Sequence, residues 1–104
     1  MNRLPTGLLV SALLRRVNDA GGFAVVRARG DETAGAVLAI TDDVLLERGL
    51  DARGEPALIE STPKPGESVD DYWARRRRSD PDLWVIELDI PQAKRLVAET
   101  FLQD

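Results

Sequence analysis

The sequence predicts an α+β domain in which three helices accompany a small, mostly antiparallel sheet of four to five strands. Three observations support this class. The 104 residues suffice for one domain, apolar residues recur at helical spacing in three segments, and the segments between them alternate with a period of two. The predicted order is helix, three strands of which the third is short, a further strand, helix, strand, helix. We therefore treat residues 1–104 as a single globular domain with a surface linker near 62–67.

The first helix is expected over residues 6–20, where apolar side chains form one stripe and polar side chains lie opposite. Thr6 is expected to cap the start of this helix with its hydroxyl. Gly21 or Gly22 is expected to end it, because glycine adopts the left-handed conformation without a steric penalty.

Residues 23–41 are predicted to form a hairpin. The apolar period falls to two from Phe23, residues 30–35 supply turn residues, and residues 36–41 resume the alternation. Gly30 is expected to permit a positive φ in the turn. Short returns between strands favour antiparallel pairing, with the helices gathered on one face of the sheet.

Two further strands are expected before the linker. Asp42 and Asp43 start a turn into residues 44–46, an apolar run too short to distinguish a strand from a helical turn, which we interpret as a strand. Residues 48–56 hold glycines, a proline and alternating charges, and are therefore predicted to be a surface loop. Residues 57–61 lie between two prolines and are predicted to form an edge strand, because proline is tolerated only at the edges and ends of a sheet.

The last part of the chain is predicted to contain a helix, a strand and a helix. Ser68 begins the helix, with Asp71 at the spacing of a capping box, and Pro81 ends it. Residues 83–88 carry the strongest β pattern of the sequence and are predicted to form a central strand. A proline in the first turn opens the final helix over residues 91–101.

Composition excludes several classes of chemistry. The chain has no cysteine and no histidine, which removes a thiolate nucleophile, an imidazole base, a disulfide and the usual zinc ligands. Its net charge of −4 argues against the broad positive field of non-specific nucleic-acid or membrane binding. No apolar run approaches the roughly 18 residues of a membrane helix, and no signal peptide frames residues 8–14. We expect a cytoplasmic protein without a cofactor or membrane association.

A run of four arginines, Arg75 to Arg78, is the most unusual feature of the sequence. Tyr72 and Trp73 precede it, and proteins that bind single-stranded nucleic acid combine cations with stacking aromatics in this way. Arg75, Arg77 and Arg78 are therefore candidate contacts for an anion or a nucleic acid. Arg27 and Arg29, on one face of a predicted strand, are candidate helpers.

We prefer a structural interpretation of the same segment. Four consecutive helical residues spread about 300° around the axis, so the guanidinium groups of the run cannot form one patch. Tyr72 and Trp73 share an apolar stripe with Val69, as core residues do. Asp71 stands four residues before Arg75, a spacing that predicts a local ion pair.

Four carboxylates, Asp80, Asp82, Glu87 and Asp89, cluster around the predicted central strand. Glu87 and Asp89 share a face about 6.6 to 7 Å apart, a separation that a divalent ion could bridge. No other residues offer to complete such a site. We therefore interpret Asp80 and Asp82 as turn residues and the other two as a solvated strand face, and assign no catalytic, cofactor-binding or metal-binding residue.

Several blocks spread over the whole chain carry a family resemblance. They are residues 13–16, 21–26, 29–31 with 35–38, and 76–87, the last containing the final three arginines of the run followed by Ser-Asp-Pro-Asp-Leu-Trp. In these blocks the chain resembles a small alphaproteobacterial family called domain of unknown function 1491. The resemblance implies a free-standing bacterial cytoplasmic domain, and it transfers no activity and no site residue.

Three hypotheses for function follow. The leading hypothesis is a cytoplasmic, non-enzymatic interaction module that binds a protein partner or itself through the hairpin or an exposed edge strand. The alternative is a nucleic-acid accessory protein that uses the run from Arg75 to Arg78. The third is an enzyme in which Glu87 and Asp89 hold a divalent ion.

Overall fold

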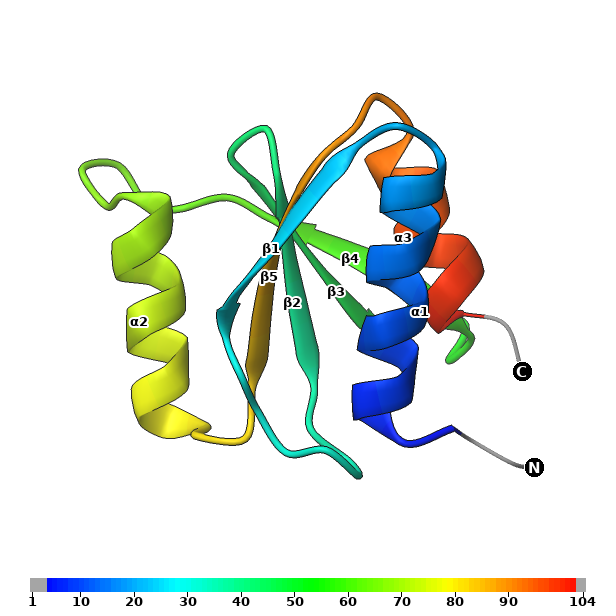
Figure 1. Cartoon of the computed structure of the whole chain (residues 1–104). Helices are drawn as coiled ribbons and strands as arrows, with labels where there is room; N and C mark the ends of the chain where they lie inside the picture. Colours follow the sequence, from blue (N-terminus) through cyan, green and yellow to red (C-terminus); the bar gives the residue numbers. More distant parts are fainter. Residues whose placement is uncertain (1–3, 103–104) are drawn as a thin grey trace.

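A computed structural model describes residues 4–102 of the chain. The protein forms a five-stranded mixed sheet with helices on both faces (Figure 1). The elements in chain order are α1 (Thr6–Asp19), β1 (Phe23–Ala28), β2 (Val37–Thr41), β3 (Val44–Leu50), β4 (Pro56–Ser61), α2 (Val69–Ser79), β5 (Trp84–Asp89) and α3 (Ala93–Phe101). The predicted α+β class and element order are confirmed, including the strand that begins at Val44. Within residues 4–102, no helix is long and apolar enough to cross a membrane.

The sheet has the order β1-β5-β2-β3-β4, which corrects the predicted hairpin over residues 23–41. β1 and β2 do not pair with each other. β5 lies between them, antiparallel to β1 and parallel to β2, while β2, β3 and β4 form an antiparallel meander. Alternation identifies a strand but not its neighbour, so the sequence pattern could not reveal the insertion of β5. The predictions that β4 is an edge strand and that β5 is interior are confirmed.

The expectation that all helices share one face of the sheet is wrong. In Figure 1, α1 and α3 lie to the right of the sheet and α2 lies to the left. The first core cluster joins α1 and α3 to Trp84, Ile86 and Leu88 of β5, and the second places Val85 of the same strand under α2. β5 therefore has apolar side chains on both faces, which is typical of a strand covered by helices on both sides.

The ends of α1 are partly as predicted. Gly21 has a φ of +86° and ends the helix in the left-handed conformation. Thr6, however, does not cap its own helix. Its hydroxyl donates to the carbonyl of Gly35 at 2.8 Å, and the N–H groups of Thr6 and Gly7 donate to the carbonyls of Thr33 and Glu32. The loop between β1 and β2 thus satisfies the free N–H groups that begin α1.

Gly30 and Gly35 in that loop are required for a close approach rather than for a positive φ, which corrects the expectation for Gly30. Neither has a positive φ, and a Cβ atom on either one would overlap the carbonyl oxygen of Asp82. The N–H of Asp31 donates to this oxygen at 3.0 Å, and the indole N–H of Trp84 donates to the carbonyl of Asp31 at 2.8 Å. The loop is therefore fixed against the start of β5.

The predicted surface loop over residues 48–56 is shorter in the structure. β3 continues through Leu50 and β4 already begins at Pro56. Gly49 is compatible with a strand because the side chain of Ile59, on the neighbouring strand, covers it. At the other end of β3, Asp42 and Asp43 both have a positive φ and form the two-residue turn from β2.

Candidate functional site

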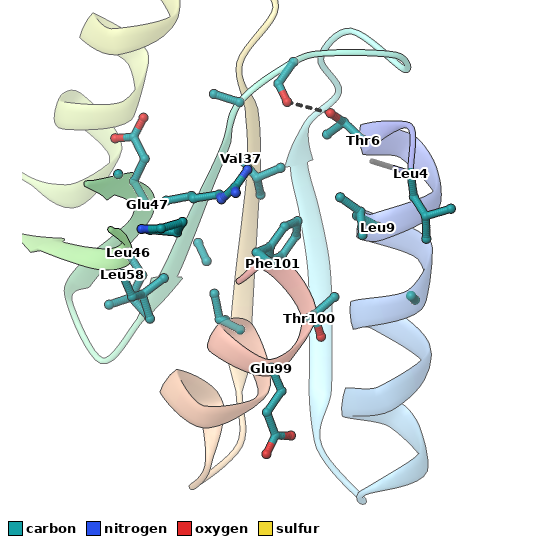
Figure 2. Close-up of a pocket in the computed structure, with 18 of the residues that line it drawn as sticks. Leu4, Thr6, Leu9, Val37, Leu46, Glu47, Leu58, Glu99, Thr100 and Phe101 are labelled. Atoms are coloured by element: carbon teal, nitrogen blue, oxygen red, sulfur yellow. Dashed lines mark hydrogen bonds between the residues drawn. The ribbon is translucent and has the colours of Figure 1, made fainter. Parts of the chain in front are cut away.

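An apolar groove of about 1040 Å³ lies between the helical layer of α1 and α3 and the strands β3 and β4 (Figure 2). The groove exists because the two helices cover only part of the sheet. They pack against each other and over β1, β5 and β2. The outer part of the same sheet face remains accessible.

The floor of the groove consists of alternate residues of three strands. Pairing of β3 with β4 sets Arg48 opposite Leu58 and Leu50 opposite Pro56, so that these four side chains project from one face. Val37 of β2 extends the floor toward the middle of the sheet.

The walls are apolar, and two exposed leucines mark the rim. Figure 2 shows Leu9 of α1 and Phe101 of α3 on the helical side of the groove, across from Leu58. Leu4, before α1, is 58% exposed, and Leu50, at the end of β3, is 67% exposed. Single exposed leucines are common on protein surfaces, but exposed leucines around one apolar groove mark a surface suited to binding.

Three of the charged residues that line the groove are neutralised within the fold. Arg16 donates to a carboxylate oxygen of Glu99 at 2.7 Å and to the hydroxyl of Thr100 at 3.2 Å. Glu47 points to the opposite face of the sheet, where it accepts two hydrogen bonds from Arg76. The occupant of the groove therefore meets little of these charges.

Arg48 is the charged lining residue that differs. It is half-buried on β3 with Leu46 and Leu50 as its neighbours on the same strand face. Among residues 4–102, no carboxylate lies within 4.0 Å of its guanidinium group. The groove thus combines an apolar surface with one cation that is open to an anionic partner.

Two of the threonine hydroxyls that line the groove, those of Thr6 and Thr100, form hydrogen bonds within the fold. Thr6 donates to Gly35, as the dashed line in Figure 2 shows, and the Thr100 hydroxyl donates to the carbonyl of Leu96 at 2.8 Å. The chain has neither cysteine nor histidine to activate them.

The arginine run lies on α2, across the sheet from the groove. Most of its guanidinium groups form hydrogen bonds with other residues of the chain. Arg75 donates to both carboxylate oxygens of Glu67 at 3.0 and 3.2 Å, not to Asp71, so the predicted local pair is wrong. Glu67 lies in the preceding turn, where its carboxylate reaches the guanidinium as a bidentate partner. Hydrogen bonding between them lowers the pKa of Glu67 and raises the pKa of Arg75.

The other three arginines point to different partners. Arg76 bonds Glu47 on β3, and this hydrogen bond raises the pKa of Arg76 above its ordinary value. Arg77 donates to the carbonyls of Arg29 and Pro81, and Arg78 is exposed. Arg75, Arg77 and Arg78 are thus not brought together around one ligand position.

The aromatic residues before the run, predicted as core residues, pack partly buried against the core beneath α2. Tyr72 and Trp73 are half-buried against the second core cluster. The indole N–H of Trp73 donates to Asp70 at 3.0 Å, and the guanidinium of Arg75 lies 5.1 Å from the centre of the Tyr72 ring. These contacts hold the helix on the sheet.

The four carboxylates around β5 have different surroundings in the structure. Glu87 accepts two hydrogen bonds from Arg27, at 2.8 and 2.6 Å, and Asp80 accepts from the N–H of Asp82 in the turn that follows α2. Asp89 is exposed at the end of the strand. In the part of the chain that the structure describes, no three carboxylates are grouped so that they could hold a metal ion.

The second candidate helper, Arg29, lies beside the loop that joins β1 to β2. Its guanidinium lies 5.2 Å from the centre of the Trp84 ring and 3.4 Å from a carboxylate oxygen of Glu32. Both residues approach α2: Arg27 lines a surface hollow with Asp70, and the carbonyl of Arg29 accepts a hydrogen bond from Arg77. Their guanidinium groups are paired with Glu87 and Glu32.

Comparison with known families agrees with this fold. Residues 4–98 match the family model described as protein of unknown function DUF1491. The chain belongs to this family. Among curated proteins, none matches the sequence.

Solved structures of related proteins have the same architecture as this DUF1491 protein. A crystal structure of a DUF1491 family protein from Caulobacter crescentus is 34% identical, with a TM-score of 0.72 over 90% of this chain and 94% of that one. An A. tumefaciens protein solved in solution is 31% identical, with a TM-score of 0.69 over 91% of this chain and 92% of that one. A C. crescentus family member solved by NMR is 32% identical, with a TM-score of 0.69 over 92% and 94%.

Sequence reasoning missed the groove of this DUF1491 protein. The prediction of a loop over residues 48–56 hides the strand face of Arg48 and Leu50, and the predicted edge strand over residues 57–61 contains Leu58 without indicating a groove beside it. The signal that could have found them is alternation: Leu46, Arg48 and Leu50 follow one another at a period of two. A single cation between two leucines on one strand face is typical of a binding surface that is mostly apolar and has one polar contact.

Proposed function

We propose that this DUF1491 protein is a non-enzymatic interaction module that binds a segment of a partner protein in the groove beside β3 and β4. The partner segment carries an apolar surface and a carboxylate that pairs with Arg48. One observation carries the proposal: a half-buried arginine that has no carboxylate partner within residues 4–102 stands in an open apolar groove. Removing such a cation from water is favourable only when an anion accompanies the apolar surface that covers it.

The exposed rim of the groove favours a protein segment over a small molecule. Small-molecule pockets usually enclose about 300 to 1,000 Å³ and bury most of their ligand. The groove, at about 1040 Å³, lies at the upper limit and is bordered by the exposed side chains of Leu4 and Leu50. A macromolecular partner covers both the groove and these rim residues, and thereby removes apolar surface that a small ligand leaves in water.

The alternative function remains nucleic-acid binding through Arg75, Arg77 and Arg78. Arg75 and Arg77 already have partners within the fold, and the net charge of −4 opposes a broad attraction to phosphates. The third hypothesis, a metal site at Glu87 and Asp89, competes with the ion pair between Glu87 and Arg27. We therefore favour the groove.

We also propose that the protein acts in the bacterial cytoplasm. The related DUF1491 structure from Caulobacter crescentus supports a bacterial origin. A chain without cysteine is compatible with a reducing compartment. The partner is accordingly expected among cytoplasmic proteins.

Affinity capture from a bacterial lysate tests the proposal, with and without nuclease. The bait is the wild-type chain, the variant Arg48→Glu, or the matched control Arg78→Glu, which makes the same charge change on the other side of the sheet. With the wild-type bait we expect to capture a protein in near-equal stoichiometry, and its capture is expected to resist nuclease. The amount captured is expected to fall by at least about tenfold with Arg48→Glu and to be retained with Arg78→Glu. Capture that is unaffected by Arg48→Glu contradicts the proposal. Captured nucleic acid that is lost on nuclease treatment, and lost with the double variant Arg77→Gln and Arg78→Gln, supports the alternative.

A further inference from the structure

We infer that the segment bound in the groove is an amphipathic α-helix with one aspartate or glutamate inside its apolar stripe. This inference rests on the proposed function and names the chemistry of the partner. It follows from two features of the groove: the state of its backbone hydrogen bonds and the position of Arg48.

The floor of the groove offers no free backbone hydrogen-bonding groups. β3 is paired on one side with β2 and on the other side with β4, and β2 is itself paired with β5. β4 is the edge strand, and the free N–H and carbonyl groups of its outer edge point away from β3 in the plane of the sheet, not into the groove over its face. An extended peptide across this surface finds no N–H or carbonyl partners for its own backbone. Buried backbone groups are nearly always paired, so such a peptide is a poor occupant of the groove.

The walls do not supply these partners either. α1 and α3 are helices whose backbone groups bond within the helix. At the start of α1, where N–H groups are otherwise free, those of Thr6 and Gly7 already donate to the loop between β1 and β2. A helix satisfies its own backbone and presents only side chains, which is what an apolar floor between helical walls can accept.

The space over β3 and the edge strand β4 is bounded by the helical layer on one side only. A helix, about 10 to 12 Å across with its side chains, can therefore lie there beside α1 and α3. α1 and α3 already form a helical layer on this face of the sheet (Figure 1). A partner helix extends that layer over its uncovered part.

The position of Arg48 sets the pattern on the partner helix. Arg48 lies opposite Leu58 and between Leu46 and Leu50 on its own strand face, so its charge is surrounded by apolar side chains. An acidic side chain that faces it is expected to have apolar neighbours three and four residues before and after it on the partner helix. A partner with a basic residue at that position is rejected by like-charge repulsion.

Selection from a displayed library of random peptides of about 16 residues, roughly four helical turns, tests this inference. The targets are the wild-type chain, Arg48→Glu and the control Arg78→Glu, each checked for an unchanged thermal transition. We expect wild type and Arg78→Glu to select the same amphipathic pattern with one acidic residue in its stripe. Arg48→Glu is expected to select lysine or arginine at that position.

A selected peptide made synthetically completes the test. It is expected to gain helical circular dichroism on binding and to lose at least about tenfold in affinity for Arg48→Glu, with recovery when its acidic residue becomes lysine. The variant Leu50→Asp, at the exposed rim, reports whether binding occurs in the groove at all.

The outcomes separate the two proposals. Peptides that lose binding to Leu50→Asp but alternate with a period of two, or carry no acidic preference, overturn the helix while leaving the groove as the binding site. Peptides that bind Leu50→Asp and Arg48→Glu as well as wild type overturn both proposals, as does a selection that enriches no peptide.

Discussion

Arg76 on α2 and Glu47 on β3 form a bidentate ion pair, with two N–H···O bonds of 2.9 and 2.8 Å. Both side chains are about three-quarters buried, with exposures of 28% and 27%. The pair connects the helix to the middle strand of the β2–β3–β4 meander. It gives one member of the arginine run a structural role that is independent of any ligand.

Replacing Arg76 by glutamine is expected to lower the free energy of unfolding by about 1 to 2 kcal/mol, because a partly buried charge-assisted bond is lost. Arg76→Lys is expected to recover only part of this, since lysine cannot bond both oxygens. Urea unfolding measures both effects. The exposed Arg78→Gln serves as the control, with an expected change within about 0.5 kcal/mol. Equal stability of the two glutamine variants contradicts the assignment.

Gly35→Ala is expected to destabilise the fold by about 1 to 3 kcal/mol, because the new methyl group overlaps the carbonyl of Asp82 and the loop must shift. Gly66 is the comparison. It has a φ of +82° and open space around it, so Gly66→Ala carries only the conformational cost of about 1 kcal/mol. Thermal unfolding of the two variants measures the difference. If Gly66→Ala proves the more damaging, the loop is not held as tightly as the structure indicates.

Thr6→Val is expected to cost about 1 to 2 kcal/mol, because it keeps the shape of a buried side chain and leaves the Gly35 carbonyl without its donor. Thr6→Ser retains the hydroxyl and is expected to be closer to wild type. Chemical denaturation distinguishes the bond from packing. A serine variant less stable than the valine variant indicates that the methyl group, not the hydroxyl, matters at this position.

Acid is expected to weaken the contact between Glu67 and Arg75. The pKa of Glu67 in the fold lies below its ordinary value of 4.5, chiefly because Arg75 donates to it. Because the pKa of Glu67 is lowered in the fold, the stabilisation is present at pH values above its pKa in the unfolded chain. The stabilisation is lost as the pH falls through the pKa of Glu67 in the fold. Glu67→Gln should therefore reduce stability at about pH 7 and have less effect at about pH 2. Unfolding curves across this range measure the effect, and a constant difference between the two proteins contradicts it.

Chain periodicity predicts most of the helices and strands, but not the full length of β3 and not how the strands are arranged. The patterns of α1, β5 and α3 are long enough to identify their type, and Ser68 marks the start of α2 correctly. The order of strands depends on long-range pairing, which leaves no local pattern. The glycines of the loop between β1 and β2 were similarly interpreted as turn residues, whereas their role depends on Asp82, a residue distant in the sequence.

The groove could be predicted only in part. Its residues lie on alternating positions of β3 and β4, but Gly49 and Pro56 resemble loop residues when each is considered by itself. That Arg48 projects between apolar side chains follows from the pairing of β3 with β4 and from the limited cover of α1 and α3. The arginine run was the more conspicuous charge in the sequence, yet folding assigns most of it to partners within the chain.

The insertion of β5 between β1 and β2 has a consequence for the order of synthesis. In the described sheet β1 has one neighbour, β5, and Phe23 pairs with Asp89. β1 must therefore await β5, which is synthesised later than β2, β3, β4 and α2, before it joins the sheet, while β2, β3 and β4 pair with neighbours in sequence. A chain interrupted before β5 leaves β1 without any strand partner, so synthesis through β5 is a condition for completing the sheet.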